Sequence, residues 1–311
     1  MSTLVSIAVC TYNTGNFLAP LLESLLQQSW TNTEIVCCDD KSTDDTVQTL
    51  EQFSRQYPGK FRIYQNENNL GYIKNFEKCL SLCSGEFIAI ADHDDLWKPH
   101  KIETLMNAIG DALLVYSDSV HIDKNGKEMG RKISDTFRLH DKPHPNAFVF
   151  YDFIWGHTML LKKELLTYAL PIPDGMPYDS WLAYTAASVS EVRYVDEPLT
   201  GWRQHDNSFT SIMYEKNKQR KENKNRKYEE HAEKLERIAL LKENKYCSNK
   251  PFMGKLYSAY EDLRKGYSSN LFFLLTNNQR TLFPIWRRNY FSKLNEFRKM
   301  ARGVKKAEPG V

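Results

Sequence analysis

The sequence predicts an α/β protein built around a mostly parallel β-sheet with helices on both sides. Short apolar runs alternate with leucine-rich helical patterns over the first ~115 residues, which is the order that a doubly wound sheet requires. The composition is that of a globular protein, with 41% hydrophobic and 26% charged residues. The 311 residues suffice for two modest domains, or for one large domain with an appendage.

The strands and helices of the first part follow one another in a regular order. The expected strands are short apolar runs at residues 5–10, 34–38, 61–64, 87–91 and 113–116. Helical spacing of apolar residues fills the segments between them: from Leu18 to near Trp30, after Thr46, around Phe76 and after Pro99. Since ligands of such sheets bind beyond the carboxyl ends of the strands, a site is expected at these ends.

Polar and mostly acidic residues follow the carboxyl ends of the expected strands. They are Thr11-Tyr12-Asn13, Asp39-Asp40, residues 66–71, Asp92-His93-Asp94-Asp95 and Ser117-Asp118. Carboxylates that cluster at a strand end repel one another unless a cation lies among them, and such oxygen ligands suit Mg²⁺ or Mn²⁺. A simpler interpretation is that Asp94 or Asp95 caps the helix after Pro99. No glycine-rich GxGxxG turn follows the first strand, which disfavours dinucleotide binding.

The order and spacing of these motifs resemble the family 2 glycosyltransferases. The resemblance extends over about residues 4–210. Within the family, the sequence is similar to bacterial members that build cell-surface polysaccharides, including rhamnosyltransferase-like ones. It implies a GT-A type fold and an inverting, single-displacement transfer of a sugar from a nucleotide-diphosphate-sugar. The matching segments are residues 6–13, 39–46, 69–71, 92–95 with Pro99, 155–159, 178–182 and 196–205.

The resemblance also assigns donor-binding residues by position. Lys74 departs from the arginine that many members place two residues later, and Lys41 replaces a glycine, which is tolerable if its φ stays negative. Alternatively, Asp40 forms a turn and Arg203 is a plain surface charge. The residues expected to bind the donor are Thr11, Tyr12, Asn13, Asp40, Gly71, Lys74, Asp92 and Arg203.

Asp179 matches the position of the catalytic base in the family. An acceptor hydroxyl has a high pKa, so it needs a base within hydrogen-bond reach during attack. One carboxylate suffices for single displacement, whereas double displacement requires a second one as nucleophile. The alternative is that Asp179 caps the helical run that follows it.

Metal and acceptor contacts are assigned to four further residues. The resemblance implies that Asp94 ligates Mg²⁺ or Mn²⁺ and that His205 lies near the metal and the diphosphate. His157 and Trp181 are expected to contact the acceptor, because aromatic rings offer apolar area to the C–H faces of sugars. Both could equally belong to the core.

The C-terminal part of the chain differs from the rest in charge. Residues 1–214 hold 18 Lys+Arg against 28 Asp+Glu, whereas residues 215–311 hold 24 against 11. From Pro284 to Lys306, apolar side chains recur at helical spacing and the opposite face is basic. A basic amphipathic helix with aromatic residues predicts attachment to an anionic membrane surface. The alternative is a helix packed on the catalytic domain with a solvated basic face.

We therefore expect three parts with different tasks. Residues 1–120 form the nucleotide-sugar-binding half, residues 121–214 the acceptor-binding half, and residues 215–311 a basic helical region. The N-terminus has no basic signal-peptide region and the six cysteines show no disulfide pattern, so a cytoplasmic protein on the inner face of the cell membrane is expected. The expected partners are a nucleotide-sugar donor and a saccharide or lipid-linked saccharide acceptor, and no nucleic acid.

Two other functions compete with the glycosyltransferase prediction. A sugar nucleotidyltransferase is disfavoured because the loop at residues 11–16 contains one glycine and no basic residue. A non-catalytic sugar-binding or scaffold member is disfavoured by the joint presence of Asp40, Asp92, Asp94 and Asp179.

Overall fold

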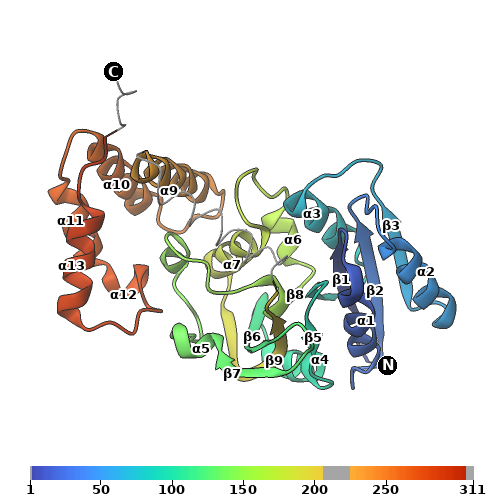
Figure 1. Cartoon of the computed structure of the whole chain (residues 1–311). Coiled ribbons are helices and arrows are strands. Elements are labelled where there is room, and N and C mark those ends of the chain that lie inside the picture. Colours follow the sequence, from blue (N-terminus) through green and yellow to red (C-terminus); the bar gives the residue numbers. More distant parts are fainter. Residues whose placement is uncertain (1, 206–224, 306–311) are drawn as a thin grey trace. The chain divides into compact units, whose positions relative to one another are not determined.

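The computed structural model describes residues 2–205 and 225–305 (Figure 1). Its contacts divide the chain into two units. The first unit is residues 1–142 with 152–204, and the second is residues 143–151 with 205–311. The predicted boundary at residue 120 inside the first part stays a prediction. No helix among the described residues is long and apolar enough to span a bilayer.

The first unit is built on one mixed sheet of nine strands in the order β3-β2-β1-β4-β8-β6-β9-β5, with β7 paired to β6. The first four strands pair in parallel, as the sequence predicts, whereas β8 is antiparallel to both β4 and β6. β6 and β9 are again parallel. The strands are β1 (Val5–Thr11), β2 (Thr33–Asp39), β3 (Phe61–Gln65), β4 (Phe87–Asp92), β5 (Leu96–Trp97), β6 (Leu114–Ile122), β7 (Glu128–Lys132), β8 (Met159–Lys162) and β9 (Val192–Arg203).

Helices cover both faces of this sheet because every strand near β1 is apolar on both sides. Leu21 and Leu105 pack with Ile7 in the core on one face of the sheet. On the other face, Cys79 and Leu80 of helix α3 are buried. The helices are α1 (Leu18–Leu26), α2 (Thr46–Gln56), α3 (Tyr72–Leu82), α4 (Lys101–Ile109), α5 (Ile133–Thr136), α6 (Leu165–Ala169) and α7 (Tyr178–Val189). Short 3₁₀ turns lie at η1 (Gly15–Phe17) and η3 (Gly156–Thr158).

Two details of the first unit differ from the sequence prediction. β6 continues to Ile122 instead of ending before Ser117, because the buried Asp118 carboxylate accepts hydrogen bonds from the backbone of Ser119 and Ser134. A polar residue can therefore lie inside the strand without losing its hydrogen bonds. Lys41 has a φ of 66°, so the condition of a negative φ is not met and the side chain occupies a conformation that favours glycine.

The second unit is helical among its described residues. Phe283 and Phe297 are fully buried in its core, with Leu235 and Ile238 among the other buried residues. Its elements are η2 (Pro145–Phe148), α9 (Arg226–Glu243), α10 (Lys250–Glu261), η4 (Asp262–Arg264), α11 (Ser269–Asn277), α12 (Gln279–Leu282) and α13 (Tyr290–Met300).

The predicted helix from Pro284 to Lys306 is wrong at both ends, because the helix of the structure covers only Tyr290–Met300. The last helix begins at Tyr290, because the Asn289 side chain accepts a hydrogen bond from the backbone N–H of Ser292 and caps that end. Residues 283–289 form an irregular connection, and Lys306 lies outside the described residues.

Candidate active site

The parallel pairing brings the predicted strand ends together. Cys10 of β1 is the register partner of Asp92 on β4, and Thr11 is the partner of Asp39 on β2. The Thr11 hydroxyl donates a hydrogen bond of 2.9 Å to the Asp39 carboxylate. The acidic ends of β2 and β4 therefore flank the end of β1, as a binding site at this edge of the sheet requires.

Asp40 fixes the loop that leads into α3. Its carboxylate accepts hydrogen bonds from Asn66 Nδ2 (2.8 Å) and from the backbone N–H groups of Leu70 (2.8 Å) and Gly71 (2.9 Å). Gly71 has a φ of 77°, which suits glycine at the residue before the helix. The role of Asp40 and Gly71 in donor binding stays a prediction, and both hold this loop in place.

Tyr12 and Asn13 lie on the turn after β1. The Asn13 side chain accepts hydrogen bonds from the backbone N–H and the hydroxyl of Thr43. The backbone N–H of Asn13 donates a hydrogen bond to Ser42 Oγ. These contacts tie the turn to the loop after β2. The Tyr12 ring is 49% exposed on this fixed turn, so it presents a flat apolar surface for stacking.

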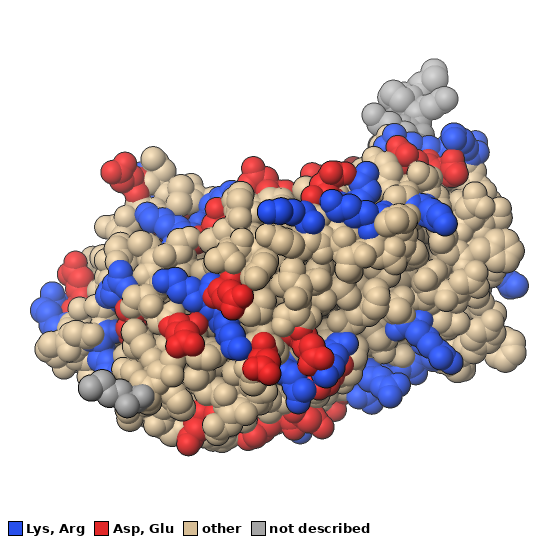
Figure 2. Space-filling model, turned by 180° about the vertical axis from the view of Figure 1, so that it is seen from behind, with Lys and Arg blue, Asp and Glu red and all other residues tan. Residues whose placement is uncertain are grey.

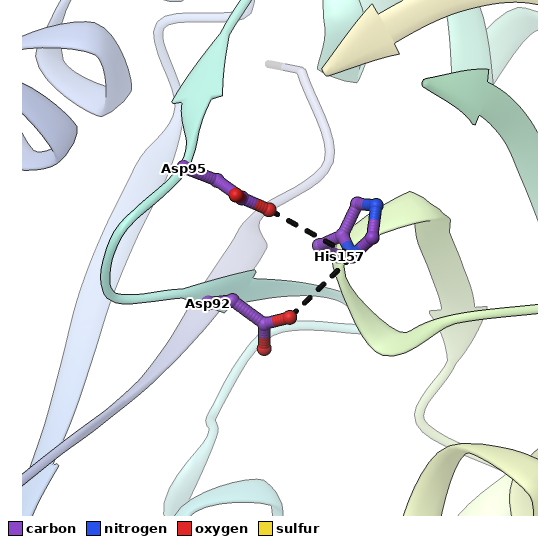
Figure 3. A group of neighbouring side chains, drawn as sticks. All are labelled: Asp92, Asp95 and His157. Atoms are coloured by element: carbon purple, nitrogen blue, oxygen red, sulfur yellow. Dashed lines mark ion pairs between the residues drawn. The ribbon is translucent and has the colours of Figure 1, made fainter. Parts of the chain in front are cut away.

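Asp92, Asp95 and His157 form a compact group at the end of β4 (Figure 3). His157 Nδ1 lies 3.4 Å from Asp92 Oδ2 and 3.7 Å from Asp95 Oδ2, while Nε2 lies 2.9 Å from Ser119 Oγ. Each of the three residues offers one ligand atom, and these atoms lie within 4.8 Å of one another. Asp95 Oδ2 is buried and has no hydrogen-bond partner among the described residues. Such a set of two carboxylates and an imidazole fits a divalent cation.

Burial and charge set the protonation of this group. Burial opposes ionisation of Asp92, but the hydrogen bond and the charge of His157 outweigh it and lower the pKa of Asp92. Burial raises the pKa of Asp95 well above its usual range, and the charges of Asp94 and Asp92 add to this effect. The pKa of the partly exposed Asp92 is thus lowered and that of the buried Asp95 is raised, so Asp95 is the member whose ionisation a nearby cation would favour most.

Two buried basic residues support the turn between β4 and β5. Lys101 Nζ donates to the carbonyl of His157 and to Thr200 Oγ1, and burial lowers its pKa. The backbone N–H of Arg203 donates to Asp95 Oδ1 (2.9 Å), and its Nε donates to the carbonyl of Asp94 (2.6 Å). Lys101 was not among the predicted site residues, because a lysine at a helix start is usually exposed.

Arg203 is buried, and its guanidinium is occupied by the backbone. Besides the carbonyl of Asp94, it reaches the carbonyls of Asp123 (3.2 Å) and Lys124 (2.9 Å). Arg203 is therefore not the surface charge that was the alternative interpretation. Its contacts give it a structural task in holding the turn of Asp94, and its predicted contact with the donor stays a prediction.

Asp179 lies in the first turn of α7 and faces the segment before β8. The backbone N–H of Gly156 donates to Asp179 Oδ2 (3.3 Å), and that of Ser180 donates to Oδ1 (2.8 Å). Burial raises the pKa of Asp179 to about 7, with further contributions from the charges of Asp152 and Asp92. The residue that precedes α7 is Pro177, so the alternative of Asp179 as the helix cap is wrong.

The remaining predicted residues lie in varied surroundings. Trp181 is 5% exposed and donates from Nε1 to the carbonyl of Ala169 (2.7 Å), and His157 is equally buried. Lys74 contacts Glu77, the carbonyl of Ile172 and Asp174. His205 belongs to the second unit. The acceptor contacts of His157 and Trp181, the donor contact of Lys74, and the metal contacts of Asp94 and His205 stay predictions.

Comparison with known proteins gives the family. The model of Glycosyl transferase family 2 matches residues 6–167, just over half of the chain. The chain is 37% identical over 99 residues to the putative glycosyltransferase EpsE of Bacillus subtilis, covering 32% of this chain and 36% of that protein. It is 27% identical over 223 residues to the putative glycosyltransferase EpsH of the same organism, covering 68% and 64%. The matched regions thus span between about a third and two thirds of these relatives.

Solved structures with the same fold include two with a bound donor. S. aureus TarS 1–349 in complex with UDP-GlcNAc aligns with a TM-score of 0.60 at 16% identity, covering 96% of this chain and 82% of that one. The mannosyltransferase PcManGT from Pyrobaculum calidifontis in complex with GDP-Man and Mn²⁺ aligns at 0.54 and 16% identity, covering 96% and 85%. The predicted GT-A type fold is confirmed. The family match, over the residues that carry β1 to β4 and the acidic group at their ends, shows that this chain belongs to glycosyl transferase family 2.

Proposed function

We propose that the protein transfers a sugar from a nucleoside-diphosphate-sugar to a hydroxyl of a saccharide acceptor, with inversion at the anomeric carbon. The observation that carries this proposal is the position of Asp179, whose charge interacts with that of Asp92 at the end of β4. With a pKa of about 7, Asp179 is poised to accept a proton near neutral pH.

In this mechanism the acceptor oxygen attacks the anomeric carbon from the face opposite the diphosphate. Asp179 takes the hydroxyl proton as the new C–O bond forms. The bond between the anomeric carbon and the diphosphate oxygen breaks, and the nucleoside diphosphate leaves with the electron pair. The backbone N–H groups of Gly156 and Ser180 hold the carboxylate in its place, which orients the base before the acceptor arrives.

A divalent cation, Mg²⁺ or Mn²⁺, belongs to this proposal. Asp92, Asp95 and His157 fit it, because their ligand atoms are close together and Asp95 Oδ2 is buried without a hydrogen bond among the described residues. When bound, the cation supplies neutralisation of the negative charge on the leaving diphosphate. Asp94, on the same turn, and His205 are the ligands that the family resemblance implies.

The ligands of structurally similar proteins and the chemistry of the site support the classes of donor and acceptor that we propose. TarS and PcManGT are described with UDP-GlcNAc and with GDP-Man and Mn²⁺, which supports a nucleoside-diphosphate-sugar donor here. Tyr12 and the fixed loops after β2 and β3 would bind the base, and Asp92 the ribose and diphosphate. We propose that the acceptor is a saccharide or lipid-linked saccharide of a surface polysaccharide, and that the protein works in the cytoplasm at the inner face of the cell membrane.

Thermal shift against a panel of nucleoside diphosphates, with and without Mn²⁺, tests this function. A ligand that binds only the folded state adds about 2.7 kcal/mol of stability at a hundredfold excess over its Kd. We expect one diphosphate to raise Tm in a Mn²⁺-dependent manner, after which its sugar conjugates are tested as donors. An absence of any shift would contradict the proposed donor site.

A further inference from the structure

The last helix of the second unit, α13, has one face buried and the other exposed to solvent. Phe297 is 0% exposed and packs on the rings of Phe283 and Trp286, at centroid distances of 5.0 and 5.9 Å. Ala301 and Ile285 are buried in the same core. Ile285, Phe297 and Ala301 of the apolar stripe that the sequence suggested for membrane contact are therefore used inside the unit and are not available to a bilayer.

The opposite face of α13 carries a different set of side chains. Phe291 is 80% exposed, and Asn295, Arg298 and Arg302 follow it at intervals of four, three and four residues. This spacing aligns Phe291, Asn295 and Arg298 on one side of the helix, with exposed Lys299 beside them and exposed Arg302 just past the helix end at Met300. We call Phe291, Arg298, Lys299 and Arg302 the outer face of α13. It combines a large apolar ring with three positive charges.

Few acids oppose these charges. Residues 279–305 contain eight Lys and Arg residues and a single acid, Glu296. Glu296 lies 3.3 Å from Arg288 and 3.4 Å from Lys299, so within the outer face it offsets the charge of Lys299 only in part. Figure 2 shows the distribution of these charges on one face of the molecule, where several blue Lys and Arg side chains at the lower right have no red Asp or Glu beside them.

We propose that the outer face of α13 docks on an anionic lipid bilayer, with the Phe291 ring inserted among the lipids and Arg298, Lys299 and Arg302 at the headgroups. The charges are complementary to an anionic surface, and each base adds about fivefold to binding near such a surface. A phenyl ring that is 80% exposed to water gains by entering the interface. This inference specifies the membrane partner proposed above, and it depends on neither Asp179 nor the donor.

The chain offers a matched control for this surface. Phe273 on α11 is 60% exposed and lies in the second unit as well. It lines an open groove together with Lys255 and Asp262. If the loss of any exposed phenyl ring weakened vesicle binding, variants of Phe273 and Phe291 would lose the same amount of binding.

Co-sedimentation of the full chain with phosphatidylcholine vesicles, with or without phosphatidylglycerol, tests the proposal. The wild-type protein should bind only the anionic vesicles, Phe291→Ser should weaken binding about tenfold, and Phe273→Ser should leave it unchanged. The pair Arg298→Gln and Arg302→Gln should lower binding about 25-fold, from two factors of five. Circular dichroism and Tm show that each variant is folded, since all the replaced side chains are exposed.

Three results would overturn the proposal. In the first, Phe291→Ser and the double Arg variant both bind anionic vesicles as tightly as the wild type. In the second, Phe273→Ser loses as much vesicle affinity as Phe291→Ser. In the third, the wild type binds no vesicles. Binding of RNA by a wild-type protein that does not bind vesicles is one form of the third result, because charge alone would then explain the surface. Sugar transfer to a water-soluble acceptor is measured in parallel, so that a failure of docking is distinguished from a failure of the proposed catalysis.

Discussion

The backbone N–H of Gly156 donates a hydrogen bond to the carboxylate of Asp179 at 3.3 Å. Gly156 stands at the start of η3, directly before His157, and Asp179 stands in the first turn of α7. This single contact joins the segment of the acidic group to the proposed base. Glycine is required there, because a Cβ at this position would overlap the hydroxyl of Tyr178.

Gly156→Ala should impair the reaction by displacing the base. The new methyl group forces Tyr178 or the segment itself to move, and Tyr178 is held by stacking on Phe76 at 4.0 Å. We expect kcat to fall about 100-fold, since displacements of ~1 Å cost that much. Stability should fall by about 1–3 kcal/mol. Steady-state kinetics and urea unfolding measure the two effects.

Gly254→Ala is the matched control for this variant. Gly254 lies within α10, and a Cβ there meets nothing within 4 Å. Alanine should stabilise the helix by about 0.5–1 kcal/mol and leave kcat unchanged. A Gly156→Ala enzyme with wild-type kcat would show that this contact does not position the base.

The rate of transfer should rise with pH through about 7. A general base works in its deprotonated form, and the pKa of Asp179 is about 7. Burial contributes most to this value, and the charge of Asp152 contributes next. Asp152→Asn removes that charge, so the acidic limb of the profile of kcat/KM should move to lower pH. If the acidic limb does not move, the charge of Asp152 does not contribute to the pKa of the base.

The ionisation of Asp179 should also lower the stability of the protein, so the free energy of unfolding should fall where the rate of transfer rises with pH. The folded-state pKa of Asp179 is raised above the unfolded value of about 4, so its contribution is most favourable below pH 4 and is lost as pH rises to 7. Asp179→Asn should therefore stabilise the fold by on the order of 4 kcal/mol at pH 8, at about 1.4 kcal/mol per pKa unit, and by little at pH 4. Urea unfolding at both pH values measures this difference, and equal effects at the two would contradict it.

Metal binding should depend on Asp95, which forms part of the group in Figure 3. Asp95→Asn keeps an oxygen for the backbone N–H of Arg203 and removes the charge that a cation requires. We expect the Kd for Mn²⁺ to rise about 10–100-fold, measured by calorimetry or paramagnetic resonance on the purified protein. Asp94→Ala tests the ligand that the family resemblance implies in the same assay.

Asp174→Asn provides the control for surface charge in the metal assay. The Asp174 side chain is 92% exposed and pairs with Lys74 at 3.4 Å. Its removal should leave the affinity for Mn²⁺ unchanged. If Asp95→Asn binds Mn²⁺ like this control, the group of Asp92, Asp95 and His157 does not hold the cation.

Much of the first unit could be predicted from the sequence, because its strands are apolar runs with polar ends. The parallel strands and the gathering of Thr11, Asp39 and Asp92 at one edge follow from that pattern. The neighbourhood of His157 does not follow, since it depends on the antiparallel pairing of β8 with β4. The acceptor contact expected for His157 rested on its aromatic ring, which did not indicate that its Nδ1 lies 3.4 Å from Asp92.

The buried charges were the second feature that the sequence did not indicate. Lys101 is at the start of a helix, where a lysine normally points to solvent, yet its ammonium reaches Thr200 on β9. In the second unit, helical spacing of apolar residues was recognised, but not that Asn289 restarts the helix after an irregular connection. Both features depend on partners distant in the sequence or on a capping hydrogen bond, which periodicity does not report.

The central claim is that Asp179 is the base of a sugar transfer, and Asp179→Asn tests it most directly. Transfer from the donor identified by thermal shift is measured for the wild-type and variant proteins, together with donor affinity in the presence of Mn²⁺. We predict a loss of kcat of at least 100-fold, within the range that a general base contributes, with donor Kd changed less than threefold. A variant that transfers sugar at the wild-type rate would contradict the account.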